Sequence, residues 1–252
     1  MTHFSILIGL LRDRKTFLEE VRTQTKLESK IFSLLAASSL FFAVYGAILG
    51  AYGGGLQIIS SAIKLPALYL LTLLICLPTL YFFDILAGSK LDFRQYLVMA
   101  LTAVAVISVL LFSFAPVILF FLISIRDYIF FLLLNVAVMG LTGAVGVRLF
   151  YKGMRDMVID PQADSLTAVD GIEAVVPPAV AAHDKKRAKQ SSRRYLLQSW
   201  ILLYALVGSQ LAWTLKPFLD VGTGDFRLFQ PEVDQNFYAQ VLRAVGTMLG
   251  WH

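Results

Sequence analysis

The stretch "IFSLLAASSLFFAVYGAILGAY", from Ile31 to Tyr52, decides the class of this protein. It holds no charged residue over a length that can cross a bilayer. A transmembrane α-helix needs about 20 consecutive apolar residues to span a hydrocarbon core of about 30 Å. The stretch therefore predicts a membrane-spanning helix.

Four further apolar runs follow along the chain. The predicted spans are Leu65–Leu86, Leu97–Ile123, Tyr128–Tyr151 and Tyr195–Leu215. The second contains Pro66 and Pro78, which are tolerated in a bilayer where neighbouring helices satisfy the freed carbonyls, and we expect a kink near Pro78. The third run is longer than the hydrocarbon core requires. Pro116 therefore predicts either a tilted, kinked helix or a partly separate second piece.

The composition agrees with a chain surrounded by lipid. Hydrophobic residues make up 58% and charged residues only 15%, whereas soluble domains contain about 25% charged residues. The net charge of +5 favours loops rich in Lys and Arg on the cytoplasmic side over nucleic-acid binding. The single cysteine, Cys76, can form no disulfide within the chain and offers no metal-site spacing.

The distribution of positive charge predicts the orientation. Seventeen of the 22 Lys and Arg residues lie before the first span, between the second and third, or between the fourth and fifth together with Arg148 at the flank of that loop. Lys and Arg bias a loop toward the cytoplasm. The pattern predicts an all-α polytopic membrane protein with five transmembrane helices, an internal amino terminus and an external carboxyl terminus.

This topology divides the chain into five parts. They are a cytoplasmic amphipathic segment (1–30), a four-span bundle (31–151), a cytoplasmic basic loop (152–194), the fifth transmembrane helix (195–215) and an external segment with an amphipathic helix (216–252). The cationic cluster at the end of the basic loop, Lys185 to Arg194, is either an ordinary topogenic signal or a site for lipid headgroups.

Both terminal segments have amphipathic patterns. Near the amino terminus, apolar residues recur at helical spacing: Phe4, Leu7, Ile8, Leu11 and Leu18. They predict a helix that lies in the membrane interface or packs on the cytoplasmic end of the bundle. Near the carboxyl terminus, a helix from about Asp234 to Leu249 is expected to act as a lid or as a partner-binding element.

Among the polar side chains within the predicted spans, four are candidates for a specific role: Asp84, Asn135, Ser209 and Gln210. An unpaired amide in hydrocarbon costs several kcal/mol, so the default expectation is hydrogen bonding between helices. Contact with a transported substrate is the alternative. Asp84 lies close to the end of its span, and we expect it to pair with Lys90 or Arg94.

Glycine spacing predicts close helix packing. Two groups occur, Gly46, Gly50 and Gly54 in one, and Gly140, Gly143 and Gly146 in the other. Such faces pack within one bundle or form a seam between two copies of the chain. At the end of the fifth span, Trp213, Lys216 and Phe218 are predicted interfacial anchors, because aromatic and snorkelling cationic side chains favour the headgroup region.

Residues with catalytic chemistry are not grouped in the sequence. The three histidines, His3, His183 and His252, lie in terminal or loop regions, away from Cys76 and at no metal-ligand spacing. The sequence therefore predicts a non-enzymatic protein without a cofactor.

Several segments together resemble a known group. They are "IKLPALYLLTLLICLPTLYFFDILAGSKLDF" around the second span, "QLAWTLKPF" at the exit of the fifth, and the later "FRLF" and "NFY". With five spans and an amphipathic approach to the first, the chain resembles a broad family of uncharacterised bacterial integral membrane proteins, and its layout is similar to that of Yip-type proteins of membrane traffic. The resemblance implies a membrane-organising scaffold or GTPase-partner protein.

The resulting expectation is a scaffold or accessory subunit in a bacterial inner membrane. Its partners would be the lipid bilayer and a membrane protein or a second copy of the chain, not nucleic acid. The alternative is a small transporter or channel in which Asp84, Asn135 and Gln210 line one polar pathway.

Overall fold

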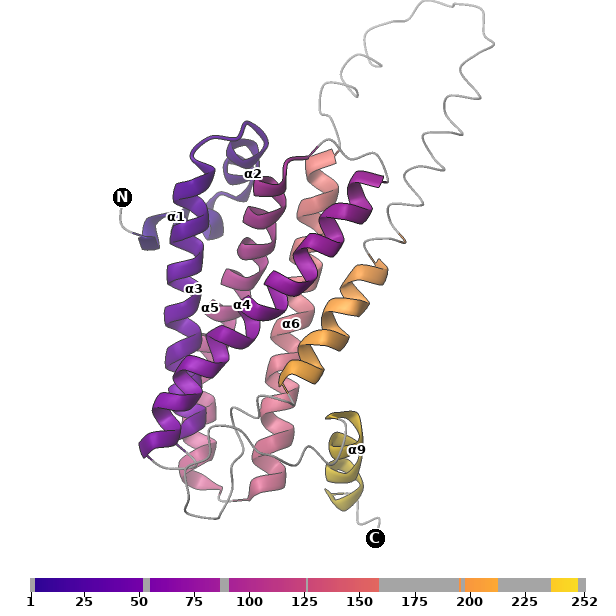
Figure 1. The fold of residues 1–252 in the computed structure, drawn as a ribbon. Coiled ribbons are helices and arrows are strands. Elements are labelled where there is room, and N and C mark those ends of the chain that lie inside the picture. Colours follow the sequence, from indigo (N-terminus) through magenta and orange to yellow (C-terminus); the bar gives the residue numbers. More distant parts are fainter. Residues whose placement is uncertain are drawn as a thin grey trace, which may run out of the picture.

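Four long helices form the body of the computed structural model (Figure 1). The structure describes residues 3–51, 55–86, 91–125, 127–158, 195, 198–212 and 237–248. The helices α3 (Leu27–Gly50), α4 (Gly55–Leu86), α5 (Phe93–Ser124) and α6 (Tyr128–Val158) are each long and apolar enough to cross a membrane. The predicted all-α, multi-pass class is confirmed.

The helices α3 and α4 meet through two glycines of α3. A Cβ atom on Gly46 would lie 2.4 Å from the carbonyl oxygen of Ser61, and one on Gly50 would lie 2.4 Å from that of Gln57. Only glycine permits such an approach of two backbones. Both glycines therefore face a neighbour in the same bundle, while Gly54 lies outside the described residues.

The helix α4 begins at Gly55, ten residues before the predicted start at Leu65. The added turns contain Gln57, Ser60 and Ser61, which lower the hydropathy of the sequence. All three are buried, and two of them lie at the glycine contacts with α3. Polar residues that face another helix rather than lipid can extend a transmembrane helix.

The helices α5 and α6 form an antiparallel hairpin. A capping box between Asp92 and Gln95 starts α5, and Asp127 starts α6 by accepting a hydrogen bond of 2.8 Å from the backbone N–H of Ile129. The helix α5 continues through Pro116 to Ser124. The alternative of a separate piece after Pro116 is therefore wrong, because the helix tolerates the missing donor.

The helix α5 lies at the centre of the bundle, in contact with α3, α4 and α6. Its side chains from Val98 to Ala105 are all buried. Its far half exposes large apolar side chains, including Phe112, Phe120 and Ile123. Exposed apolar side chains on a helix whose backbone hydrogen bonds are all made internally are suited to contact with lipid.

A further helix, residues 198–212, lies against α4 and α6 and is drawn in orange in Figure 1. The indole N–H of Trp200 donates a 2.8 Å hydrogen bond to the carbonyl of Cys76, and the Trp200 ring lies 5.2 Å from that of Phe150. Further along, Gly208 lies beside Thr72. Residue numbers rise along this helix while they fall along α4, so the two run antiparallel.

Short helices lie at both ends of the bundle (Figure 1). The helices α1 (His3–Arg12) and α2 (Arg14–Arg22) lie near the start of α3, and α9 (Phe237–Met248) packs on α6 near the opposite end. The helix α9 falls within the predicted range from Asp234 to Leu249.

Candidate functional site

The end of the bundle at which α3 and α5 begin and α4 and α6 end is rich in cations, and we call it the basic end. The cations on the helices and turns at this end are Arg12, Arg22, Lys26, Lys30, Arg94, Arg148, Lys152 and Arg155. The helix α6 has 31 residues, which corresponds to about 46 Å at 1.5 Å per residue. Because the hydrocarbon core is about 30 Å thick, its cationic end can extend into the headgroup region.

The helices α1 and α2 dock on the basic end through an apolar face. Leu10, Phe17 and Val21 are buried, whereas Ile8 is 60% exposed. Of the two positions predicted for this segment, the described contacts with α3, α5 and α6 correspond to packing on the bundle. Of the predicted face, Leu18 packs against the core as expected and Ile8 does not, while the side chains of Phe4, Leu7 and Leu11 lie outside those described. Asp13 separates the two helices and caps α2 by accepting from the backbone N–H of Thr16.

Lys30 is a buried cation at this junction, with 4% of its surface exposed. Its ammonium lies 2.7 Å from a carboxylate oxygen of Glu20, donates to the carbonyl of Thr25 at 2.9 Å and sits 5.6 Å from the ring centre of Phe17. The sequence alone places Lys30 among the loop cations before the first span. In the structure it instead ties α2 and the following turn to α3.

Gln95 connects the end of α2 to α5. Its side-chain amide donates to the backbone carbonyls of Val21 and Arg22 at 3.0 and 3.2 Å. Arg94 forms a 2.9 Å ion pair with Glu28 at the start of α3. That pair is exposed and contributes little to stability, so the buried amide contacts are the stronger constraint on the position of α2.

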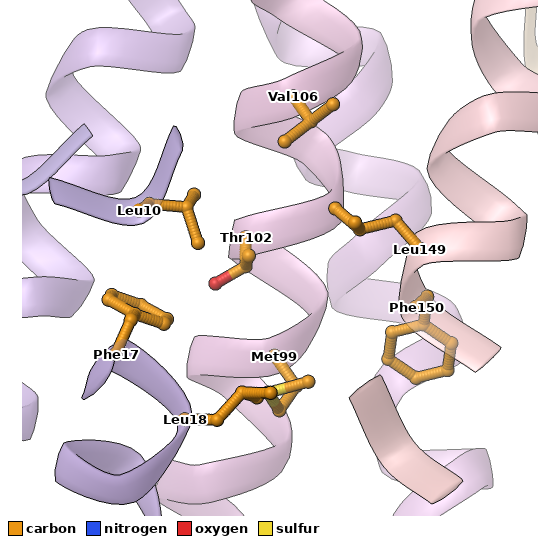
Figure 2. Close-up of a pocket in the computed structure, with 8 residues that line it drawn as sticks. All are labelled: Leu10, Phe17, Leu18, Met99, Thr102, Val106, Leu149 and Phe150. Atoms are coloured by element: carbon orange, nitrogen blue, oxygen red, sulfur yellow. The ribbon is translucent and has the colours of Figure 1, made fainter. Parts of the chain in front are cut away.

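A partly enclosed cavity of about 180 Å³ lies between these docked helices and the hairpin of α5 and α6. Its lining consists of Leu10, Phe17, Leu18, Met99, Thr102, Val106, Leu149 and Phe150. Figure 2 shows these side chains converging from α1 and α2 on one side and from α5 and α6 on the other. The hydroxyl of Thr102 donates to the carbonyl of Val98, so the lining is apolar apart from an already paired hydroxyl.

The cavity is apolar and only partly enclosed. Protein interiors are close-packed and have few voids larger than a water molecule. A volume of about 180 Å³ between four helices is therefore space that an apolar group can enter.

Asn135 and Tyr45 form a hydrogen bond between α6 and α3. The phenol of Tyr45 donates to the side-chain oxygen of Asn135 at 3.2 Å, and both residues are buried. The amide nitrogen of Asn135 donates in turn to the carbonyl of Phe131. The contact joins two transmembrane helices, and Tyr45 is a member that the sequence alone does not identify.

Asp84 lies near the end of α4, where the phenol of Tyr96 in α5 donates to its carboxylate. Both residues are buried. Of the two cations expected to pair with Asp84, Arg94 forms its ion pair with Glu28 and Lys90 lies outside the described residues. Asp84 therefore contacts α5 through a phenol that hydropathy alone does not single out.

Ser209 and Gln210 lie near the end of helix 198–212, and both are half-buried. The hydroxyls of Ser209 and Tyr238 are hydrogen-bonded at 2.9 Å, which joins this helix to α9. Gln210 is not without a partner either. The predicted anchors Trp213, Lys216 and Phe218 lie outside the described residues, as does the cluster from Lys185 to Arg194.

The second glycine group is divided between two surroundings. A Cβ on Gly146 would lie 2.4 Å from Ile107 of α5. At Gly140 and Gly143 an added Cβ would meet no described atom within 4 Å. One glycine of α6 therefore belongs to the bundle interior, and two lie on an open surface.

Comparison with protein-family models found no match for this chain, and neither did comparison with curated proteins or with solved structures.

Proposed function

We propose that this chain is a non-enzymatic scaffold or accessory subunit of a membrane complex in a bacterial inner membrane, with a Yip-like role in membrane organisation. The observation that carries the proposal is the open surface of α6 around Gly140 and Gly143. Ala137 and Ala144 are exposed on the same helix. Small residues let the backbone of a second transmembrane helix approach closely.

The contrast among the glycines supports a partner at this surface. Gly46, Gly50 and Gly146 are each covered by a neighbour in the bundle. A helix that contacts only lipid gains nothing from glycine, which lowers helix stability by about 1 kcal/mol relative to alanine. A membrane protein or a second copy of the chain seated on Gly140 and Gly143 gives these residues the same packing role.

Five spans with an internal amino terminus complete the proposal. Its support is the antiparallel course of helix 198–212 along α4, together with the position of α9 near the end opposite the basic end. Cations concentrated at the basic end favour a cytoplasmic location for that end.

The transporter alternative requires Asp84, Asn135 and Gln210 to line one polar pathway. Asp84 contacts Tyr96 of α5, close to the point where Arg94 of α5 meets Glu28 of α3. Asn135 contacts Tyr45, which lies seventeen residues after Glu28 along α3. At 1.5 Å per residue this separates the two polar contacts by about 25 Å. Neither Asp84 nor Asn135 lines the cavity of Figure 2, so the arrangement favours the scaffold.

Purification in mild detergent, followed by mass spectrometry of the eluted complex, tests the proposal. We expect a co-purifying membrane protein or a second copy of the chain, and loss of that species in the variant Gly143→Leu. The matched control is Gly55→Leu, because an added Cβ at Gly55 also meets no described atom. A lone monomer under every condition contradicts the scaffold, and equal recovery in both variants contradicts a docking surface on α6.

A further inference from the structure

We infer that the cavity between α1, α2, α5 and α6 is a binding site for an acyl chain of an anionic phospholipid from the leaflet at the basic end. The inference concerns a different surface from the partner surface of α6, and it does not depend on the scaffold proposal. It rests on the shape, lining and surroundings of the cavity shown in Figure 2.

The lining of the cavity extends along α5, in the direction in which lipid chains would lie. Met99, Thr102 and Val106 line it from successive turns of α5. From Met99 to Val106 the helix rises about 10 Å. Because α5 has the length and hydropathy of a transmembrane helix, the cavity follows the helix axis inward from the basic end.

The volume suits part of an acyl chain. An apolar cavity of about 150 Å³ accepts benzene, which has six carbon atoms, and remains dry when empty. The volume here is about 180 Å³, which is enough for a comparable number of methylene groups. Lipid is the most abundant apolar molecule around a multi-pass membrane protein. We therefore take an acyl chain as the occupant.

The charges around the cavity favour an anionic headgroup. Exposed cations lie next to its wall in sequence: Arg12 follows Leu10 by two residues, and Arg148 and Lys152 flank Leu149 and Phe150. The carboxylates of Glu20 and Asp156 are paired with Lys30 and Arg155. That of Asp13 accepts from the neutral hydroxyl of Thr16 and keeps its charge, and Glu19 is exposed beside Leu18. Three cations against these two carboxylates leave a net positive charge.

Fluorescence quenching by brominated lipid tests the inference, because Trp200 reports on the cavity. Its ring lies 5.2 Å from that of Phe150, which lines the cavity. Replacing the other two tryptophans, Trp213→Phe and Trp251→Phe, leaves Trp200 as the sole reporter. The full-length protein is placed in phosphatidylcholine nanodiscs with increasing fractions of brominated phosphatidylglycerol or, in parallel, brominated phosphatidylcholine.

We expect saturable quenching at low mole fractions of brominated phosphatidylglycerol, and only gradual quenching by brominated phosphatidylcholine. The variant Val106→Phe fills the cavity and should abolish the saturable part. The matched control Val117→Phe makes the same change at an exposed position of α5 and should retain it. Equal quenching by the two brominated lipids in the parent protein overturns the inference.

A second variant keeps the test independent of packing defects. Arg148→Gln with Lys152→Gln changes only exposed side chains. Each cation removed is expected to raise the half-saturating mole fraction of phosphatidylglycerol about fivefold. An unchanged half-saturating fraction in this variant contradicts headgroup recognition at the cavity, and unchanged saturable quenching in Val106→Phe contradicts occupancy of the cavity itself.

Discussion

The bundle of α3 to α6 and the helix 198–212 are held by different means. Within the bundle, α3 and α4 approach so closely at Gly46 and Gly50 that their backbones touch. Helix 198–212 rests on the bundle through large side chains, chiefly Trp200 against Cys76 and Phe150. Closely packed backbones leave little freedom to separate locally, whereas a helix that rests on the bundle through side chains can loosen while the bundle remains intact.

A larger residue at the glycine contact between α3 and α4 should have the largest effect on stability. The variant Gly46→Leu places a side chain where Cβ alone lies 2.4 Å from a backbone oxygen. Overpacking typically costs about 1–3 kcal/mol, and we expect the upper end or more because backbone must move. Unfolding in mixed micelles measures the loss. The matched control is Gly55→Leu, whose added Cβ meets no described atom, and an equal loss in both variants contradicts close packing of α3 on α4 at Gly46.

Loosening helix 198–212 should have a smaller, local effect. The variant Trp200→Phe removes the hydrogen bond to the Cys76 carbonyl, which is worth about 0.5–1.5 kcal/mol. Cys76 is the only cysteine and is 1% exposed. Its rate of labelling by a maleimide should rise while the unfolding midpoint of the bundle stays nearly constant. If Cys76 labelling is unaffected, helix 198–212 does not cover α4 as described.

Breaking the hydrogen bond between Tyr45 and Asn135 should have a still smaller effect. Buried hydrogen bonds between transmembrane helices contribute about 0.6 kcal/mol on average. A double-mutant cycle with Tyr45→Phe and Asn135→Leu should give a coupling energy of that size for this 3.2 Å contact. Strictly additive single effects are the outcome that excludes the interaction.

The smallest effect is expected at the ion pair between Glu28 and Arg94. Its side chains are 80% and 59% exposed, and exposed ion pairs contribute between about 0 and 1 kcal/mol. The variant Arg94→Gln should leave the unfolding midpoint unchanged within error. A large loss would show that the pair helps to hold α3 and α5 together.

The long apolar runs are the part of the fold that sequence reasoning predicts well. Hydropathy failed at the start of α4, because Gln57 and Ser61 are polar in sequence but buried against the glycines of α3. It also failed at the amino terminus, where Leu10 rather than Ile8 faces the bundle. In both places a neighbouring helix, not the local pattern, determines which residues are buried.

The candidate site was harder to predict than the spans. Asn135 and Asp84 stand out because polar groups are costly in hydrocarbon, but their partners Tyr45 and Tyr96 look like ordinary interfacial or lipid-facing aromatic residues. The cavity is formed between two pairs of helices, α1 with α2 and α5 with α6, and the two pairs are far apart in sequence. No spacing rule within one helix carries information about such a volume.

Labelling of two single-cysteine variants tests the central claim that helix 198–212 crosses the membrane as a fifth span. On a Cys76→Ser background, Arg155→Cys places a thiol at the basic end of α6, and Arg243→Cys places one on α9; both positions are exposed. An impermeant maleimide added to intact spheroplasts should label Arg243→Cys, and should label Arg155→Cys only after lysis. Labelling of both variants from the same side of the membrane would contradict an odd number of spans.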